Sequence, residues 1–341
     1  MQQYNTHYFK YYALDSNMAN PTVVNCIEDG GTVSYNSLDS LKTNARLKVS
    51  LDTSEIFDIK RIRICSVLNG NELPCGTFLV ATPSSQFESA VQSIDVTCYS
   101  TLWPVKVDKC DTRYYVPLGT NAVNEVKRIL GRFGYQVIIP DSTKTTSVNQ
   151  EWEIGTSYLE IVNSLLDSIG YTSLYVDVYG NYVAKPDILP SLREAEIIYD
   201  SDDINNIIEP SAESELDLFN VPNKFIRYVN SPEVDLTAVY INSRGITGTE
   251  ATGIVNVDSQ EVNDASDYDT LYELCKKAAE EATSIYHKVT IYTAINPIHL
   301  FLNCLHLNHY QLRGKFIETS WDIELQTGGT MTHNLREVIA C

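Results

Sequence analysis

The order in which hydrophobic patterns follow one another along the chain is the strongest constraint on its fold. Short segments with alternating apolar residues, the pattern of half-buried strands, fill residues 1–110 and return after residue 196. Between them, residues 111–195 carry two helical patterns, each followed by Gly-Tyr and a short apolar run. A chain that leaves a β pattern and later resumes it predicts a unit inserted into a β framework.

The first part of the chain predicts several short strands. Leu47, Val49 and Leu51 alternate with polar residues, as in a strand with one buried face. Further strands are predicted at 62–64, 77–82 and 91–98. Short strands at this spacing are typical of a sandwich or barrel, so we expect a β domain over residues 1–110.

The middle of the chain predicts a small α+β domain over residues 111–195. Thr120 is the expected N-cap of a helix that ends at Gly134, and Ser157 opens a second helix that ends at Gly170. A hairpin with its turn at Tyr179-Gly180-Asn181 follows. We expect both helix-ending glycines at positive φ. The expected core contains Val126, Leu130, Phe133, Leu159, Val162, Leu166 and Ile169.

The last part, residues 196–341, predicts a second β domain that also contains a long helix. Residues 196–217 hold eight carboxylates and no basic residue, which indicates a connector or a solvated strand edge. The Gly- and Thr-rich segment 245–258 is expected to be loop with at most one edge strand. The helix is expected at about 266–287, beginning at Ser266 or Asp267. Its expected apolar face contains Leu271, Leu274, Ala278, Ala282 and Ile285.

The charge balance excludes one common class of function. With 44 acidic and 25 basic side chains the net charge is −19, which argues against sequence-independent binding to nucleic acid. Such a charge keeps a protein soluble, or it forms a surface that repels an anionic molecule. We expect no signal peptide and no membrane insertion, because no basic segment precedes an apolar run and no apolar run approaches the roughly 18 residues of a membrane helix. A soluble chain folded in a cytoplasm is therefore expected.

Residues that could carry chemistry form no recognised motif. The eight cysteines include no C-x-x-C pair and are expected to be small buried side chains. The best metal candidates are His299, Cys304, His306 and His309, but alternating leucines favour a strand in which 304 and 306 face one side and 309 the other. We therefore expect no metal site, no stoichiometric zinc and no cofactor.

Three acids flanked by aromatic residues are the remaining catalytic candidates. They are Glu153, Asp177 and Asp322, with Trp152 and Trp321 as the aromatic neighbours. Whether two of them form a glycosidase-type pair depends on tertiary geometry, and a packed indole beside a solvated acid is the favoured interpretation. With no nucleophile elbow and no phosphate-binding loop, we expect no catalytic residue and no enzyme activity.

Four segments resemble the hub and tail-tip proteins of phage tail baseplates, and they occur in the order found in that family. The segments are NELPCGTFLVATPS (71–84), the helix, Gly-Tyr, strand and hairpin of 152–186, VPNKFIRYVN (221–230), and the closing hairpin of 314–338. Cys75 stands where leucine is commoner in the family.

The resemblance implies two tube-like β-barrel domains that flank the inserted α+β domain. It also implies a homotrimeric ring whose six tube domains imitate the hexameric tail tube, and which joins that tube to a central spike or fibre. The implied partners are further copies of this chain, the tail tube or distal tail protein, and the tail spike, fibre or tape-measure protein. DNA would pass through without specific binding, and a lumen lined with carboxylates would prevent sticking. The implied location is the virion tail, assembled in the cytoplasm of the bacterial host.

Two other functions stay open at this point. One is a tail-associated cell-wall hydrolase, against which the absence of a catalytic motif counts. The other is a tail module that binds a host glycan through exposed tyrosine and tryptophan side chains.

Overall fold

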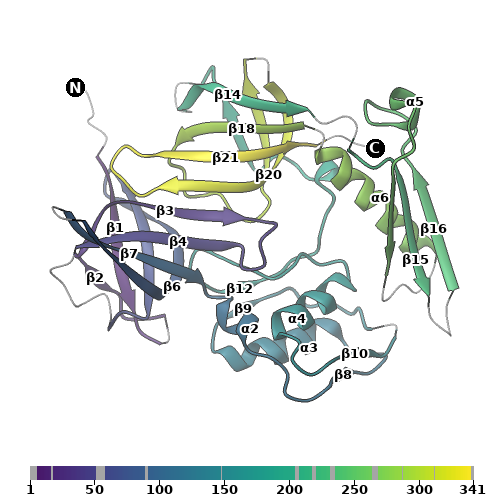
Figure 1. The fold of residues 1–341 in the computed structure, drawn as a ribbon, viewed down its shortest axis with the longest axis horizontal. Coiled ribbons are helices and arrows are strands. Elements are labelled where there is room, and N and C mark those ends of the chain that lie inside the picture. The colour runs from purple at the N-terminus through teal and green to yellow at the C-terminus, as the bar shows by residue number, and fades with distance from the viewer. Residues whose placement is uncertain are drawn as a thin grey trace.

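The computed structural model describes residues 6–338, apart from positions 17, 147, 286 and 311 and the segments 51–57, 89–90, 204–206, 217–219, 231–234 and 263–267. The fold is mainly β, as the sequence predicts, with helices gathered below and to the right of a large sheet in Figure 1. Among the described residues, no helix is long and apolar enough to cross a membrane.

A sheet of thirteen strands forms the body of the molecule. The first β unit contributes β1 (His7–Leu14), β2 (Thr22–Val24), β3 (Ile27–Asn36), β4 (Thr43–Ser50), β5 (Arg61–Leu68), β6 (Asn71–Glu88) and β7 (Val91–Ser100). The second β unit contributes β13 (Ile197–Asp200), β14 (Ile208–Leu216), β18 (His287–Ala294), β19 (Cys304–His309), β20 (Leu312–Glu324) and β21 (Thr330–Glu337). The strands expected near 46–51, 62–64, 77–82 and 91–98 are confirmed.

The two β units are joined through one antiparallel strand pair, β3 with β20. The pairing runs from Asn36 opposite Ser320 to Thr32 opposite Glu324. Side chains from both ends of the chain therefore share one core, in which Trp321 and Ile323 pack with Val33. Local patterns in the sequence do not predict this joint, because the paired residues lie almost 300 positions apart.

The acidic segment forms the edge of the sheet. β14 contains Glu209, Glu213 and Glu215, and among the described strands it pairs only with β18. The solvated strand edge is confirmed for Ile208–Leu216, whereas Ile197–Asp200 form β13 with Ile197 and Tyr199 buried, and 204–206 and 217 lie outside the described residues. Carboxylates on an edge strand oppose unwanted pairing with another chain, since acidic neighbours repel.

The insert is a compact unit at the bottom of Figure 1. It contains β8 (Tyr114–Val116), α3 (Ala122–Leu130), η1 (Gly131–Phe133), β9 (Val137–Ile138), β10 (Gln150–Trp152), α4 (Tyr158–Asp167), β11 (Tyr175–Val176) and β12 (Tyr182–Val183). Helix α2 (Trp103–Val107) precedes the predicted start of the insert at residue 111, and its Val105 packs into the core of the insert. Six of the seven expected core residues are buried, and Phe133 is partly buried against Tyr158.

The ends of the two long helices of the insert agree closely with the sequence prediction. The Ser157 hydroxyl accepts the Glu160 N–H at the start of α4, as expected. At the start of α3 the N-cap is Asn121 and not Thr120, since the Asn121 side chain accepts the Asn124 N–H at 2.9 Å. After the two helices, Gly134 and Gly170 have φ values of 75° and 71°, which confirms their left-handed conformation.

A second helical unit, which the sequence analysis did not separate from the second β domain, lies at the right of Figure 1. Strands β15 (Lys224–Asn230), β16 (Asp235–Ile241) and β17 (Val257–Glu261) form a small sheet, with α5 (Thr249–Thr252) beside it. Helix α6 (Tyr268–Ile285) packs on this sheet through Leu271, Cys275 and Ala279. The expected start at Ser266 or Asp267 lies outside the described residues.

The buried face of α6 is centred differently from the prediction. Cys275 and Ala279 are fully buried, whereas the expected Leu274 and Ala278 are only partly buried. Ala282 is buried as predicted. The small side chains at the centre of this face let the helix approach the sheet closely.

The hairpin tip of the insert fixes it to the first β unit. The Thr101 hydroxyl donates to the Gly180 carbonyl at 2.9 Å, and the Tyr182 hydroxyl donates to the Thr101 carbonyl at 3.0 Å. A Cβ atom on Gly180 would lie 2.9 Å from Met18 Cε and 3.1 Å from Thr101 Cγ2. Glycine at this turn therefore permits both the positive φ of 85° and the close approach.

Replacing Gly170 with valine is expected to lower the free energy of unfolding by about 1–2 kcal/mol, because a β-branched residue is strained at positive φ. The position has room, since the nearest atom to an added Cβ is Lys144 Nζ at 3.7 Å, so backbone strain is the only penalty. Urea unfolding measures the loss of stability. Hydrogen exchange should show faster exchange in the insert and unchanged exchange in the β units.

Gly131→Val is the matched control for this prediction. Gly131 is also exposed and ends a helix, but its φ is −57° and no atom lies within 4 Å of an added Cβ. Its substitution should change stability by less than about 0.5 kcal/mol. Equal losses in the two variants would contradict the role assigned to the backbone conformation.

Candidate functional site

The four metal candidates from the sequence do not come together. His299 and His309 are buried, whereas His306 is exposed on β19. Within the described part of the chain, the group with geometry closest to a metal site contains His299 with Glu318 and His333. The expectation that 304 and 306 share one side of a strand is consistent with β19, but these two do not form a site with His299.

The three acids flanked by aromatic residues have structural partners. Glu153 is exposed and pairs with Arg113 at 2.9 Å, and Asp177 holds its own turn by accepting the N–H groups of Tyr179 and Asn181. Asp322 accepts a hydrogen bond from Ser34 at 2.5 Å. Each carboxylate is thus engaged in a separate part of the fold.

The seven cysteines that the structure describes are all buried and free, as expected. Burial raises the pKa of the Cys75 thiol to about 12, and it has the same effect on Cys98. A thiol with so high a pKa stays protonated and unreactive near neutral pH. Cys341 lies outside the described residues.

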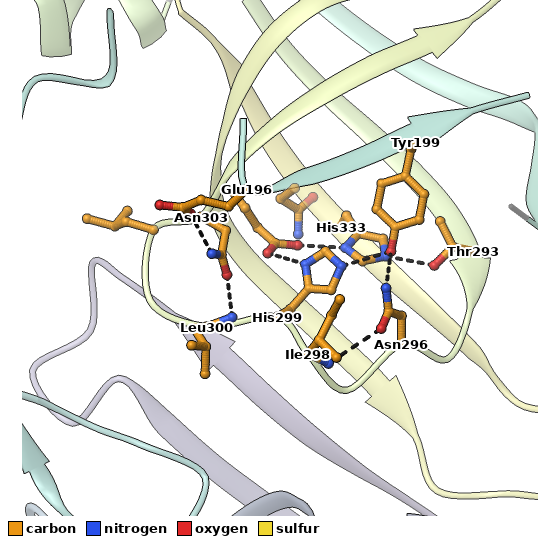
Figure 2. Close-up of polar contacts among 12 residues, drawn as sticks. Glu196, Tyr199, Thr293, Asn296, Ile298, His299, Leu300, Asn303 and His333 are labelled. Carbon is orange, nitrogen blue, oxygen red and sulfur yellow. Dashed lines mark hydrogen bonds and ion pairs between the residues drawn. The ribbon is translucent and has the colours of Figure 1, made fainter. Parts of the chain in front are cut away.

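A fully buried carboxylate with two histidine partners is the most unusual polar arrangement in the described structure. Glu318 on β20 accepts hydrogen bonds from His299 Nδ1 and His333 Nδ1, one to each carboxylate oxygen, both at 2.6 Å. All three side chains have zero exposed area. Figure 2 shows the two imidazole rings side by side, between the loop that follows β18 and strand β21.

The outer nitrogens of both rings also have partners. His299 Nε2 lies 2.8 Å from the Tyr199 hydroxyl, and His333 Nε2 lies 2.8 Å from Thr293 Oγ1. Tyr199 also stacks on His299, with ring centroids 5.7 Å apart. We call these five residues the Glu318 network. Because its nitrogen and carboxylate groups satisfy one another, the network is complete without an ion.

The electrostatics favour a charged carboxylate beside neutral His333. Burial alone would raise the pKa of Glu318, but the two histidine donors outweigh burial and hold this pKa below its usual value. Burial lowers the pKa of His333, and the nearby carboxylate offsets only part of that effect. Removing one member of such a network strongly destabilises the fold, because its partner is left buried in a low dielectric without a hydrogen bond.

The Glu318 network positions the loop 295–303, which links β18 to β19. His299 lies in this loop, and the Glu318 backbone N–H donates to the Asn303 carbonyl at 2.9 Å. The Asn303 side chain in turn accepts the Leu300 N–H, and its amide donates to Glu196. The loop is therefore held by side chains at both of its ends (Figure 2).

The loop inserts Phe301 where three parts of the molecule meet. The Phe301 ring stacks on Tyr175 of the insert, with centroids 4.4 Å apart. It also meets Tyr35 of the first β unit edge to face, at 6.0 Å. Phe301 lies only two positions after His299 in the chain. The network and the contact together fix the second β unit against the first β unit and the insert.

A cavity of about 300 Å³ lies beside this loop, between the insert and the second β unit. Lys185, Arg193, Glu196 and Phe301 are among its lining residues. Arg193 is neutralised there by Glu196 at 2.7 Å and donates to the Leu302 carbonyl. The arrangement offers mixed charge and no cluster of groups with a common chemistry.

The sequence analysis missed Glu318 and His333, although one of them leaves a signal. His333 stands between Met331 and Leu335, at an inward position of an alternating strand, and such a histidine is expected to be buried. Glu318 has no comparable signal, because its partners come from segments far apart in the chain.

Glu318→Gln is expected to lower the free energy of unfolding by about 3 kcal/mol, because the buried histidine donors lose the charge that they face. Glu337→Gln is the matched control. Glu337 also accepts from a histidine, His287 at 2.7 Å, but its side chain is 28% exposed. The control should lose less than about 1 kcal/mol. Urea unfolding near neutral pH measures both, and similar losses would contradict a special role for burial.

Acidification is expected to destabilise the protein through His333. Because burial lowers the pKa of His333, the unfolded chain protonates this ring at a pH where the folded protein keeps it neutral. The resulting contribution to stability is complete above the unfolded pKa of about 6.5 and is lost as the pH falls toward the folded pKa. The depressed pKa of Glu318 adds a loss of the same sign at lower pH, beginning near the unfolded value of about 4.3.

The test is the slope of unfolding free energy against pH between 7 and 5. His333→Asn keeps an N–H donor toward Glu318 but does not titrate, so its slope should be smaller than that of the wild type. His306→Asn, at an exposed position of β19, should leave the slope unchanged. Equal slopes in wild type and His333→Asn would show that the ring is not held neutral by the fold.

Comparison with known proteins identifies the fold but not a close relative. No family model matches the sequence, and no curated protein matches it. Among solved structures, the tail protein from Neisseria meningitidis MC58 has a TM-score of 0.71 and 12% identity over 97% of both chains. The 43 kDa tail protein of prophage MuSo2 from Shewanella oneidensis has a TM-score of 0.68 and 10% identity, over 97% of this chain and 98% of that one.

A secretion-system protein has a weaker likeness. The c3393 protein of E. coli is a component of the type VI secretion system with structural similarity to the T4 bacteriophage tail proteins gp27 and gp5. Its TM-score is 0.51 at 8% identity, over 98% of this chain and 73% of that one. These identities are low, but the first two likenesses span both chains almost from end to end. The chain therefore has the fold of phage and prophage tail proteins, which agrees with the tail-protein resemblance of its four sequence segments.

Proposed function

We propose that this protein is a structural hub of a phage or prophage tail baseplate or tail tip. Three copies would form a ring that joins the hexameric tail tube to the central spike or fibre. The observation that carries the proposal is the fold shared with tail proteins over 97% of the chain. The same observation supports a virion tail location and a structural role without enzyme activity.

The proposed domain division follows the hydrophobic cores. Residues 1–110 and 196–341 would supply the two tube-like domains of each copy, with 111–195 as the insert. The core of the insert is distinct from the core that the two β units share, which supports this division. The small sheet with α6 would then be an appendage of the second tube-like domain, because it has a core of its own.

Edge strands and charge support the ring. Besides the acidic edge at β14, the large sheet has edges at β2 and β13, and each of these strands has a neighbour on one side only among the described residues. Such an edge, without the row of carboxylates found on β14, is a natural site for pairing between copies. The net charge of −19 suits a channel through which DNA passes without sticking.

The proposed partners follow from this assembly. They are further copies of this chain, a tail tube or distal tail protein on one side, and a spike, fibre or tape-measure protein on the other. The likeness to a type VI secretion component similar to the T4 tail proteins gp27 and gp5 supports a connection to a spike.

A homotrimer is the expected assembly, formed at high protein concentration or when the tail tube protein is added. Sedimentation velocity over a range of concentrations measures the mass, and electron microscopy of the trimer should show a ring with a central channel. A stable dimer would contradict the proposal, as would a trimer with no room for a channel.

A further inference from the structure

A row of three side chains crosses the joint between the two β units. Tyr35 on β3 is the direct cross-strand partner of Trp321 on β20 and of Thr43 on β4. Side chains at paired positions point to the same face of a sheet, so the three lie side by side. The Tyr35 and Trp321 rings are stacked, with centroids 5.5 Å apart.

Each member of this row has a buried polar atom with unused hydrogen-bonding capacity. Within the described part of the chain, Thr43 Oγ1 and Trp321 Nε1 are buried without a partner, and the buried Tyr35 hydroxyl has at most the Leu302 backbone as a donor, so its own O–H has no acceptor. Tyr35 and Trp321 are only 4% and 5% exposed. Native proteins rarely leave such atoms unsatisfied, and three in one row indicate that something occupies the space before them.

A small cavity lies in front of the row. Its volume is about 30 Å³, and Tyr35, Thr43 and Trp321 are all among its lining residues. The loop that carries Phe301 and the hairpin of the insert at Val178 also line it. A water molecule needs about 10–15 Å³ of such space, so the cavity fits one or two waters and no organic ligand.

We infer that one or two ordered water molecules occupy this cavity and bridge the two β units. Water can accept the Trp321 N–H and also donate to or accept from the two hydroxyls, which no simple ion can do. The bridge would tie Tyr35 and Thr43 of the first β unit to Trp321 of the second. Because this inference concerns the packing of one chain, it is independent of the proposed function.

Charge makes an ion a poorer occupant of this cavity than water. A halide could accept from all three groups, but the carboxylate of Glu318 lies close enough to act on the Tyr35 hydroxyl. Burial and then this negative charge raise the pKa of Tyr35, and the nearby Leu302 backbone offsets only part of the rise. An anion would meet the same repulsion. A cation would face the Trp321 N–H, which offers no lone pair.

Two substitutions that keep shape test the inference. Tyr35→Phe and Thr43→Val each remove one hydroxyl and preserve the volume of the side chain. If water bridges the hydroxyls, each variant loses hydrogen bonds and its Tm should fall by about 2 °C. The double variant should lose less than the sum, because both hydroxyls share the same water.

Thr247→Val is the matched control. Thr247 Oγ1 is also buried without a partner, but Thr247 does not line this cavity. Its substitution should leave the Tm unchanged or raise it, because it removes an unsatisfied group. If Tyr35→Phe and Thr43→Val also leave the Tm unchanged or raise it, the cavity is dry and the inference is overturned.

A crystal structure of the wild-type protein provides a second, direct measurement. Density for water at about 2.7–3.2 Å from Tyr35, Thr43 and Trp321 would confirm the bridge. An empty cavity would overturn it. Crystals grown with bromide would distinguish a halide from water. An anomalous peak in the cavity would show that an anion occupies it, which would overturn the inference.

Discussion

The antiparallel pairing of β3 with β20 is the interaction on which the rest of the structure depends. It spans five paired positions from Thr32 to Asn36, and it makes one continuous sheet of strands from both ends of the chain. Without this pairing the shared core would split, since Trp321 and Ile323 pack with Val33 across it. The insert attaches to this shared sheet through the hairpin at Gly180 and through the contact between Tyr175 and Phe301.

The Glu318 network and Phe301 secure the same joint from the side of the second β unit. The buried carboxylate orients His299 through one hydrogen bond, and the loop then delivers an aromatic ring to Tyr35 and Tyr175. Polar and apolar contacts thus act together over three consecutive residues of one loop. A buried charge in this place favours one conformation of the loop within the second β unit, because moving His299 away would leave the Glu318 carboxylate without one of its two donors.

The parts of the fold that local chemistry determines were predictable from the sequence. The helix ends at Ser157, Gly134 and Gly170 follow from capping and backbone preferences, and they agree with the structure. The joint between the β units was not predictable, since cross-strand partners far apart in sequence leave no local pattern. The burial and pairing of Glu318 were not predictable for the same reason, because its histidine partners come from a loop and from another strand.

The shared core has a consequence for synthesis on the ribosome. Trp321, Ile323 and Met331 complete a core whose other members begin at Tyr11. The N-terminal strands therefore cannot bury their inner face fully until nearly the whole chain has emerged, whereas the insert can close its core earlier. Contacts so distant in sequence form slowly, because a long loop must close first. A nascent chain of this kind exposes apolar strands for most of its translation, which makes it a natural client of chaperones.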